Sequence, residues 1–497
     1  MRPSEKVNKA AKPRAQADRY KNRHETGSMM RGIGGRGVFL LVLALVFAAC
    51  TRPDGPASGP PTAREAEGLA ILEEALVNDH DHMDPHEHPL VEWRLDQVFD
   101  GNLPLNGKPI SPASEFVIHG NLAFVSLFHP SAGIVILDIS EPEKPRHVGY
   151  FDSGTAYVND IEVSPDGRWA FLPTSPIKTA ENDPLNGGLA IAGDYGIQVA
   201  DVSNPKDPKL ATFWAGPDKD GYHRCDLEVI NGQLYVFGAS LGYPRIDILR
   251  FEPTPVPRLV PVGVYVSDSA REVGKDQASG PNGFGTHDVT VDPDPLQGFP
   301  LMAVSHWRSG AHFVDVRDPA NPRFLGKWSE FPGVTVGNVH NVEFTKIEGQ
   351  RVAVVVPEYP QDPKTRGTHW IVNITDFSRP TTLGQWSIPG EHPPGNDPFS
   401  SNRVLIRNGT LYVAHFHAGV LVVDIHTLAK AQKPELLGFV VPAGESLVPY
   451  STVRANPYIY DAIPRGDHLF YTDLTGGFHV ARMTPDMRSP EATAPAQ

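Results

Sequence analysis

The chain has 497 residues, a formal net charge of −14 and only two cysteines, Cys50 and Cys225. Residues 1–49 carry ten Lys/Arg and three Asp/Glu, so the remainder of the chain has a charge of −21. An acidic surface of this kind repels a phosphate backbone, which excludes nucleic acid as an expected partner. Two cysteines also exclude a disulfide framework, so a folded domain here must rest on a large core.

Residues 1–49 have the organisation of a secretory signal peptide. A basic segment precedes an apolar run of about a dozen residues from Gly37, which is shorter than the ~20 residues of a transmembrane helix. Ala48-Ala49-Cys50 resembles the end of a lipobox, so we expect lipidation at Cys50 and a membrane anchor through that lipid. A plain signal peptide or an anchor helix is the alternative.

The signal peptide is long because 28 residues precede Met29. Signal n-regions are short, so we expect translation to start at Met29 or Met30. Residues 1–28 are then either a misassigned start or an unusually long n-region.

Residues 50–88 form a second segment that follows the lipidated cysteine. Residues 51–66 are rich in Pro, Gly and Ser and suit a flexible tether. Thr51 stands where Asp would signal inner-membrane retention, which favours sorting to the outer membrane and cell surface. The tether continues into a tract whose four histidines bind Zn, Cu or Ni loosely, or belong to a solvated linker. They are His80, His82, His86 and His88.

The rest of the chain contains a repeated unit. A glycine begins a short apolar strand that ends in Asp or Asn, and a Pro-rich turn follows; Gly133-IVILDISEPEKP is a clear copy. Further copies begin at Gly196, Gly310, Gly367 and Gly419, and a degenerate copy begins at Tyr243. The strand ends are 46 to 68 residues apart. A β-propeller blade of four strands needs ~40–50 residues, and longer spacings indicate longer loops.

Each unit predicts four strands. Two strands joined by hairpin turns such as Asn-Gly precede the glycine, and a fourth strand follows the Pro turn. The last unit supplies three strands and ends at Met483, while Pro89-LVEWRLDQVFDG matches the missing fourth strand. We therefore predict an all-β fold, a β-propeller of seven four-stranded blades over residues 89–483, closed by its N-terminal strand. Six blades are the alternative, and residues 484–497 are predicted to be a disordered tail.

The series resembles the LVIVD-repeat family of bacterial surface and secreted proteins. Ile134-VILDISEPEKP, Phe313-VDVRDPANP and Val420-LVVDI carry the resemblance, with ANPYIYDAIPRGDHLFYTDLTGG at the end. The resemblance implies an exported β-propeller lipoprotein, and it implies little about activity because the family is known mainly by its repeats. Asn373 stands where the repeat usually has Asp, and we interpret this difference from the family pattern as structural and not functional.

In a propeller, the first strand of each blade begins near the channel, where the second strand ends. The predicted first-strand entries share an Asp or Asn at their second position. They are Asn159-Asp160, Cys225-Asp226, His287-Asp288, His340-Asn341, Ser401-Asn402 and Tyr460-Asp461. The second-strand ends align four side chains at one level: His306, Glu358, His415 and Asp473. Arg308 and His417 follow two residues after the first and third of these.

This pattern predicts a metal site at one mouth of the channel. The expected ligands of a divalent transition metal (Zn, Cu, Fe or Mn) are His287, His340, His306 and His415. Five further side chains are expected as additional ligands or as partners that orient the imidazoles, namely Glu358, Asp288, Asp473, Asp461 and His417. Arg308 is expected to bind an anionic substrate. The alternative is structural: Asp and Asn bind neighbouring main-chain N–H groups and join the blades, and the histidines are solvated.

Two functions follow from these alternatives. The first is a binding or scaffold protein at the cell surface, with an unknown small-molecule or protein ligand. The second is an exported metal-dependent enzyme, an oxidase or a hydrolase, with its active site in the channel.

Overall fold

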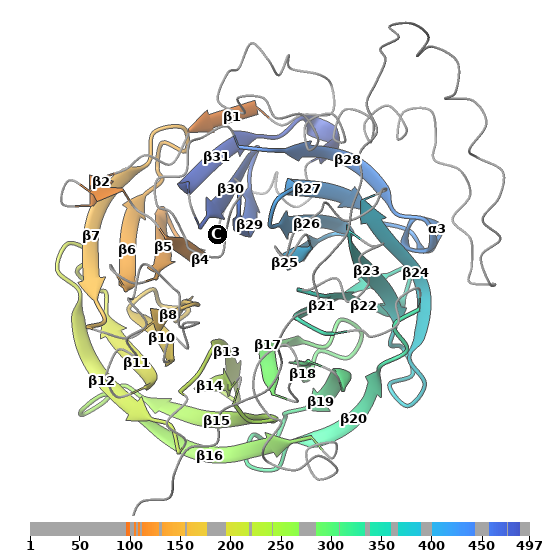
Figure 1. The fold of residues 1–497 in the computed structure, drawn as a ribbon. Coiled ribbons are helices and arrows are strands. Elements are labelled where there is room, and N and C mark those ends of the chain that lie inside the picture. The colour runs from red at the N-terminus through yellow and green to blue at the C-terminus, as the bar shows by residue number, and fades with distance from the viewer. Residues whose placement is uncertain are drawn as a thin grey trace, which may run out of the picture. The chain divides into compact units, whose positions relative to one another are not determined.

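A computed structural model of the chain shows seven four-stranded antiparallel sheets arranged in a ring (Figure 1). The chain is therefore a seven-bladed β-propeller, as predicted. The residues that the structure describes are 96–99, 104–105, 108–109, 112–128, 132–154, 157–175, 195–217, 221–240, 242–267, 285–307, 309–332, 338–358, 366–388, 400–442, 457–474 and 476–487. No helix in these segments is long and apolar enough to cross a membrane.

Blades 1 to 4 follow one another along the chain, and each begins at the channel and ends at the rim. Blade 1 contains β4 (Ala113–His119), β5 (Leu122–Leu127), β6 (Gly133–Asp138) and β7 (Arg146–Asp152). Blade 2 contains an inner strand in two parts that both pair with β10, namely β8 (Tyr157–Val158) and β9 (Glu162–Val163), followed by β10 (Trp169–Ser175), β11 (Gly196–Asp201) and β12 (Lys209–Ala215). Blade 3 contains β13 (Arg224–Ile230), β14 (Gln233–Ala239), β15 (Arg245–Glu252) and β16 (Arg258–Val266). Blade 4 contains β17 (Thr286–Pro293), β18 (Pro300–His306), β19 (Gly310–Asp315) and β20 (Arg323–Trp328).

Blades 5 to 7 complete the ring. Blade 5 contains β21 (Asn341–Ile347), β22 (Gln350–Val356), β23 (Arg366–Asn373) and β24 (Thr381–Ile388). Blade 6 contains β25 (Ser401–Arg407), β26 (Thr410–His415), β27 (Gly419–Asp424), the short helix α3 (Leu428–Gln432) and β28 (Glu435–Val440). Blade 7 contains β29 (Ile459–Arg465), β30 (His468–Asp473), β31 (Gly477–Arg482) and β1 (Asp96–Phe99). The remaining elements are β2 (Pro104–Leu105), β3 (Lys108–Pro109) and the 3₁₀ turn η2 (Pro485–Met487).

The N-terminal strand closes the ring, as predicted. Strand β1 pairs antiparallel with β31, and Asp96 lies opposite Arg482 (Figure 1). The ends of the propeller sequence thus form one blade, so the sheet of blade 7 has its full four strands. Residues 89–95 of the predicted closing strand lie outside the described residues.

The core is divided into seven layers, and each layer lies between two neighbouring blades. One hydrophobic cluster contains Ile136 of blade 1 and Leu172 of blade 2. Another contains Val354 of blade 5 and Val413 of blade 6. Both faces of each sheet are therefore buried, which explains why the repeated strands are rich in Ile, Val and Leu.

A glycine in the outer strand of a blade allows the next blade to pack closely. Gly149 lies in β7 directly after a β-bulge, and a Cβ added there would overlap the carbonyl oxygen of Pro205 in blade 2. The same overlap would occur between Gly326 and the Phe377 carbonyl, which belong to blades 4 and 5. In blades 2, 4 and 5 the turn after the third strand thus rests on a glycine of the preceding blade. This contact gives a physical reason for the glycine in the repeated fourth strand.

We expect Gly149→Ala to destabilise the propeller by about 1–3 kcal/mol, because the new methyl group forces the turn at Pro205 away from β7. Urea unfolding of both proteins measures the difference. The control is Gly120→Asn, at a hairpin position with φ +56° and no atom within 4 Å of an added Cβ. Asn tolerates this backbone conformation, so the control should unfold almost as the parent does. Equal unfolding midpoints for Gly149→Ala and the parent would contradict the packing argument.

Candidate metal centre

One side chain from each blade lies at the start of the inner strand. Main-chain hydrogen bonds define this level, because the residue after the second strand donates to the entry of the first, as Trp307 does to Gly285 and Phe416 to Ser400. Counting from these bonds and from the strand registers gives seven equivalent positions, which we call the channel ring. Its members are Ser114, Asn159, His223, His287, His340, Asn402 and Tyr460.

Side chains of the channel ring contact one another from blade to blade. The Tyr460 hydroxyl donates to Asn159 Oδ1 at 2.8 Å, and the Asn159 amide lies 3.3 Å from His223 Nε2. The ring centroid of His223 lies 4.5 Å from that of His287, which lies 3.7 Å from that of His340. Three imidazoles from blades 3, 4 and 5 are therefore adjacent.

The next residue along several inner strands joins its blade to the following one. Asp160 accepts the N–H of Cys225 at 2.9 Å, and Asp461 accepts the N–H of Phe116 at 3.4 Å. Asn341 similarly accepts the N–H of Val404. These Asp and Asn residues therefore have the structural role that was the alternative to metal binding, since they bind main-chain groups across blade boundaries.

In blades 3 and 6 the predicted alignment is wrong. The expected entries were Cys225-Asp226 and Ser401-Asn402, but the registers place Arg224 and Arg403 at the level of the blade-joining residues. The β-bulge between Ser401 and Arg403 also occurs at the equivalent place in blades 4 and 7, so the error in blade 6 has another cause. The prediction took Asn402 as the recurring second residue, whereas Asn402 holds the position of His287 and Arg403 follows it.

Arg224 and Arg403 close the centre of the ring with Glu115, their equivalent in blade 1. Both arginines form ion pairs with the Glu115 carboxylate, and Arg403 Nη1 lies 2.5 Å from Glu115 Oε2. The Arg224 side chain is 1% exposed and that of Glu115 is 0% exposed. Because the three residues come from blades 1, 3 and 6, these ion pairs join strands that are not neighbours around the ring.

His287, His340 and Glu358 are the sole group of three potential metal ligands among the described residues. One ligand atom from each lies within 4.8 Å of the others, and His340 Nε2 is 3.8 Å from a Glu358 carboxylate oxygen. Both imidazoles are buried and Glu358 is partly buried. The group combines two predicted ligands with one residue predicted as an additional ligand.

Main-chain carbonyls set the orientation of both imidazoles. His287 Nδ1 donates to the carbonyl of His340 at 3.1 Å, and His340 Nδ1 donates to the carbonyl of Asn402 at 2.5 Å. A carbonyl oxygen only accepts, so each Nδ1 carries the proton and each Nε2 keeps its lone pair. This second-sphere arrangement is the usual one around histidine ligands of metal ions.

Burial keeps these imidazoles neutral. It lowers the pKa of His287 well below its usual value, and the neighbouring His340, His223 and Arg224 lower it further. Burial and the nearby Arg224 likewise lower the pKa of His340 well below its usual value. A neutral imidazole is the form that binds a metal ion, so neither ring needs to lose a proton at neutral pH.

His223 is a neighbour of this group that was not among the predicted ligands. Burial lowers its pKa to about 4, so it is also neutral at neutral pH. The sequence prediction missed it because it took Cys225-Asp226, and not His223-Arg224, as the start of the inner strand of blade 3. A shared dipeptide pattern could have revealed it, since His223-Arg224, His287-Asp288 and His340-Asn341 each place a histidine directly before a charged or polar residue.

Glu358 reaches the imidazoles because, by the strand registers, it lies one residue further along the chain than the position equivalent to His306 of blade 4. Asn341 pairs with Val356 in blade 5, whereas the equivalent Asp288 pairs with Ser305 in blade 4. Glu358 therefore corresponds to Trp307, whose ring lies 4.8 Å from that of His287. The predicted common level of Glu358 with His306, His415 and Asp473 is wrong by one residue, although the registers confirm that the other three are equivalent.

The structure does not bring His306 to the candidate metal group, which consists of His287, His340 and Glu358. Its ring stacks on His312, with centroids 5.3 Å apart, and His312 in turn contacts the Tyr265 hydroxyl and Ser309. Burial lowers the pKa of His306 to about 4. His306 therefore belongs to a buried contact between blades 3 and 4.

The other predicted residues lie elsewhere around the mouth. His415 is fully buried at the end of β26, and His417 donates through Nδ1 to the Pro457 carbonyl at 2.8 Å. Asp473 accepts the N–H of Tyr458, and Asp288 accepts from the Asn341 amide. None of these side chains, nor Asp461, joins the metal group. Six predicted residues lie outside the described part of the chain: Cys50, His80, His82, His86, His88 and Arg308.

Aromatic side chains occupy the other half of the mouth. Phe128 and Phe416 hold the position that Trp307 has in blade 4, and they pack with Tyr157 and Tyr460 in one cluster. The mouth thus has a polar sector of imidazoles and a carboxylate beside an apolar sector. A ligand bound at the polar sector would meet aromatic surface next to it.

Comparisons agree with the class that this geometry defines, a β-propeller built from repeats. A family model described as the LVIVD repeat matches residues 112–153, which correspond to blade 1, and the predicted resemblance is confirmed. A propeller with this repeat fits a binding or scaffold protein. A search of curated proteins finds no match.

Several solved structures resemble the chain at low identity. One is described as a functionally unknown protein from Desulfotomaculum acetoxidans DSM 771; it is 13% identical, with a TM-score of 0.44 over 77% of this chain and 92% of that one. A protein from Lactobacillus plantarum is 12% identical, with a TM-score of 0.46 over 67% and 86% of the two chains. The RRP9 WD40 repeats are 10% identical, with a TM-score of 0.46 over 76% and 95%. The fold assignment rests on the blade topology described above.

We expect Asp461→Ala to destabilise the propeller by about 1–3 kcal/mol, because the buried N–H of Phe116 loses its acceptor where blade 7 meets blade 1. The matched variant is Asp461→Asn, which retains an acceptor oxygen as Asn341 does in blade 5. Urea unfolding should rank the Asn variant between the parent and the Ala variant. Unfolding of the Ala variant at the parental midpoint would show that the bond does not join the blades.

Proposed function

We propose that this protein is an exported, lipid-anchored propeller that binds a divalent transition metal at one mouth of its channel and presents that mouth to a ligand. The ligands of the metal are His287, His340 and Glu358. The observation that carries the proposal is the pair of Nδ1–H bonds to main-chain carbonyls, which leaves both Nε2 lone pairs available beside a carboxylate.

The donor chemistry limits the choice of metal. Two imidazole nitrogens and one carboxylate oxygen suit Zn, Cu, Fe or Mn, whereas Mg²⁺ and Ca²⁺ prefer oxygen ligands throughout. His223 lies against His287 and is neutral, so it is a candidate fourth nitrogen donor. The buried positions of the two histidines favour a tightly held ion over a loosely bound one.

Export and lipid anchoring are supported by the N-terminal sequence. A basic segment, a short apolar run and Cys50 after two alanines match a lipoprotein signal, and Thr51 favours the outer membrane. Residues 51–88 would then separate the lipid from the propeller and leave the channel mouth accessible to an envelope ligand. Cys225, the other cysteine, is buried and has no disulfide partner.

The metal content of the purified protein tests the site. After dialysis we expect close to one transition-metal ion per chain, and we expect affinity to fall at least about tenfold in His340→Ala and in Glu358→Gln. The control is His306→Ala, which removes an equally buried imidazole that lies against His312 and outside the group. Metal loss in the control alone, or full metal content in His340→Ala, would contradict the assignment.

A metal-dependent enzyme, an oxidase or a hydrolase, is the second candidate. One observation favours it: the group supplies three protein ligands, and catalytic sites characteristically use three and keep one position open. The Co²⁺-loaded protein should then change its visible spectrum when azide is added, and Glu358→Gln should alter that spectrum. A Co²⁺ spectrum that azide leaves unchanged would indicate a closed site and would argue for binding or structure alone.

The Cys50→Ser variant tests the anchor. We expect the parent to enter the membrane fraction and to gain the mass of a lipid, and the variant to lose both properties because no thiol remains to be lipidated. Cys225→Ser is the control, since that cysteine is buried in the propeller. Membrane association of Cys50→Ser equal to that of the parent would refute the lipid anchor.

A further inference from the structure

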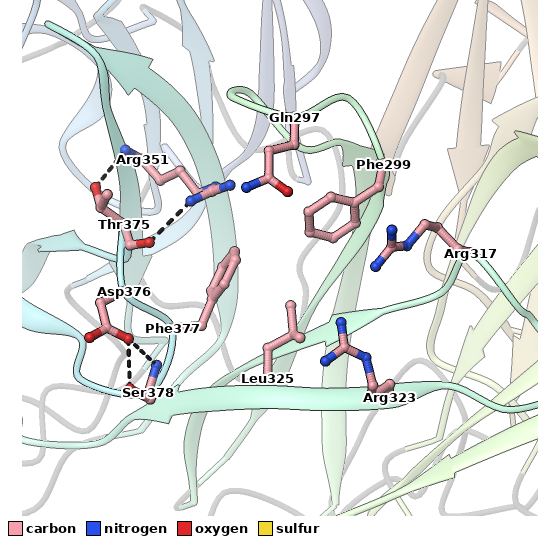
Figure 2. Close-up of a pocket in the computed structure, with 10 residues that line it drawn as sticks. All are labelled: Gln297, Phe299, Arg317, Arg323, Leu325, Arg351, Thr375, Asp376, Phe377 and Ser378. Carbon is pink, nitrogen blue, oxygen red and sulfur yellow. Dashed lines mark hydrogen bonds between the residues drawn. The ribbon is translucent and has the colours of Figure 1, made fainter.

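A pocket lies between blades 4 and 5, at the end of the blades opposite the metal group. The strands of a blade alternate in direction, so the hairpin after β17 and the Pro turns lie at the far end from His287. The pocket has a volume of about 380 Å³ and is lined by residues of both blades (Figure 2). This volume falls within the range of small-molecule sites.

A buried ion pair fixes the wall between the two blades. Arg351 of β22 binds both carboxylate oxygens of Asp294, which follows β17, and it also donates to the Thr375 carbonyl at 3.1 Å. Arg351 is 5% exposed and Asp294 is 0% exposed. Because its donors are used in this way, Arg351 is a rigid part of the wall and holds the hairpin that carries Gln297 and Phe299.

Two other arginines supply exposed positive charge. Arg317 and Arg323 lie on either side of the Pro turn of blade 4, and Figure 2 shows their guanidinium groups next to each other. Both pair with Asp315, at 2.5 and 2.8 Å, while their side chains remain 60% and 64% exposed. Burial alone would raise the pKa of Asp315, but the hydrogen bonds from the two arginines outweigh it and hold that pKa well below its usual range. One carboxylate thus faces two guanidiniums, so these three side chains together carry one net positive charge.

Apolar side chains lie directly beside these charges. Phe299, Leu325 and Phe377 point into the same space in Figure 2. The Arg317 guanidinium lies over the Phe299 ring at 5.0 Å, a cation–π contact that orients it. Asp376 also lines the pocket and adds a negative charge on the blade 5 side, where its carboxylate accepts the N–H and hydroxyl of Ser378 within its own turn.

The repeat does not require this combination. The N–H two residues after each strand-ending Asp or Asn donates back to that side chain, and Arg317 occupies this position in blade 4. The equivalent residues in blades 1, 2, 5 and 6 are small or neutral side chains or an imidazole, namely Ser140, Ser203, Thr375 and His426. The turn therefore does not need an arginine at this position, and the guanidinium of Arg317 is additional to the repeat.

We propose that the pocket between blades 4 and 5 is a binding site for a small monocarboxylate with an aromatic or branched apolar body. The carboxylate binds N–H groups of Arg317 and Arg323 other than those that donate to Asp315, and the apolar body lies against Phe299, Leu325 and Phe377. The site is separate from the metal group and goes beyond the proposed metal-binding function.

The test is calorimetric titration of the full chain with 3-phenylpropionate. We expect saturable one-to-one binding that weakens about tenfold in Arg323→Gln, because a charge-assisted hydrogen bond is lost. The matched control is Arg258→Gln on blade 3. Arg258 is also the first residue of an outer strand, is 66% exposed and shares one acid, Glu252, with a second arginine, but it lines no part of this pocket. Binding should be unchanged in the control.

Two further compounds separate the contribution of the carboxylate from that of the apolar body. Acetate carries the charge without the apolar body, and 3-phenylpropan-1-ol carries the body without the charge, so both should bind much more weakly than the acid. Inorganic phosphate or acetate binding as tightly as 3-phenylpropionate would overturn the proposal, since the site would then be an anion patch only. Equal weakening in Arg323→Gln and Arg258→Gln, or no saturation with the acid, would overturn it as well.

Discussion

The propeller depends on side-chain acceptors near the channel that bind main-chain N–H groups of the next blade. The inner strand of a blade has no neighbouring strand on its channel side, so main-chain groups at its start need another partner. Asp160 provides one for Cys225, and Asp461 provides one for Phe116 across the boundary between the ends of the chain. The apolar layers between blades supply most of the buried surface, but they are not directional, whereas these hydrogen bonds set the relative height of neighbouring blades.

The metal group is a consequence of this fixed height. When the inner strands start at one level, the preceding residues form a ring, and His287 and His340 come together because they occupy adjacent blades. Each imidazole then meets a carbonyl of the following blade, which selects the tautomer with a free Nε2. The arrangement that joins the blades therefore also orients the two imidazoles, and Glu115 pairs with Arg224 and Arg403 from the next position along the inner strands.

The repeat and the chemistry occupy different positions in the blade. Residues that the repeat needs have packing roles: Gly149 and Gly326 lie against turns of the next blade, and Asp315 organises the turn that follows it. The side chains that could bind a metal ion or a ligand lie where the blades differ, as Glu358 does in place of Trp307. Two distinct surfaces result, an imidazole and carboxylate group at one end of the ring and an arginine pair beside apolar residues at the other.

The sequence by itself determined the number of blades, the order of strands and the closure of the ring by the N-terminal strand, because glycines, hairpin turns and Asp-Pro turns are local signals. It also placed His287 and His340 together at one mouth of the channel, where their imidazoles are adjacent. Only the tertiary structure decided which side chains share a level. The register places Arg403 rather than Asn402 beside the blade-joining residues and moves Glu358 by one residue, and neither change can be seen in a local pattern. Contacts between blades follow from hydrogen-bond register, and register is set by the packed neighbours rather than by the segment itself.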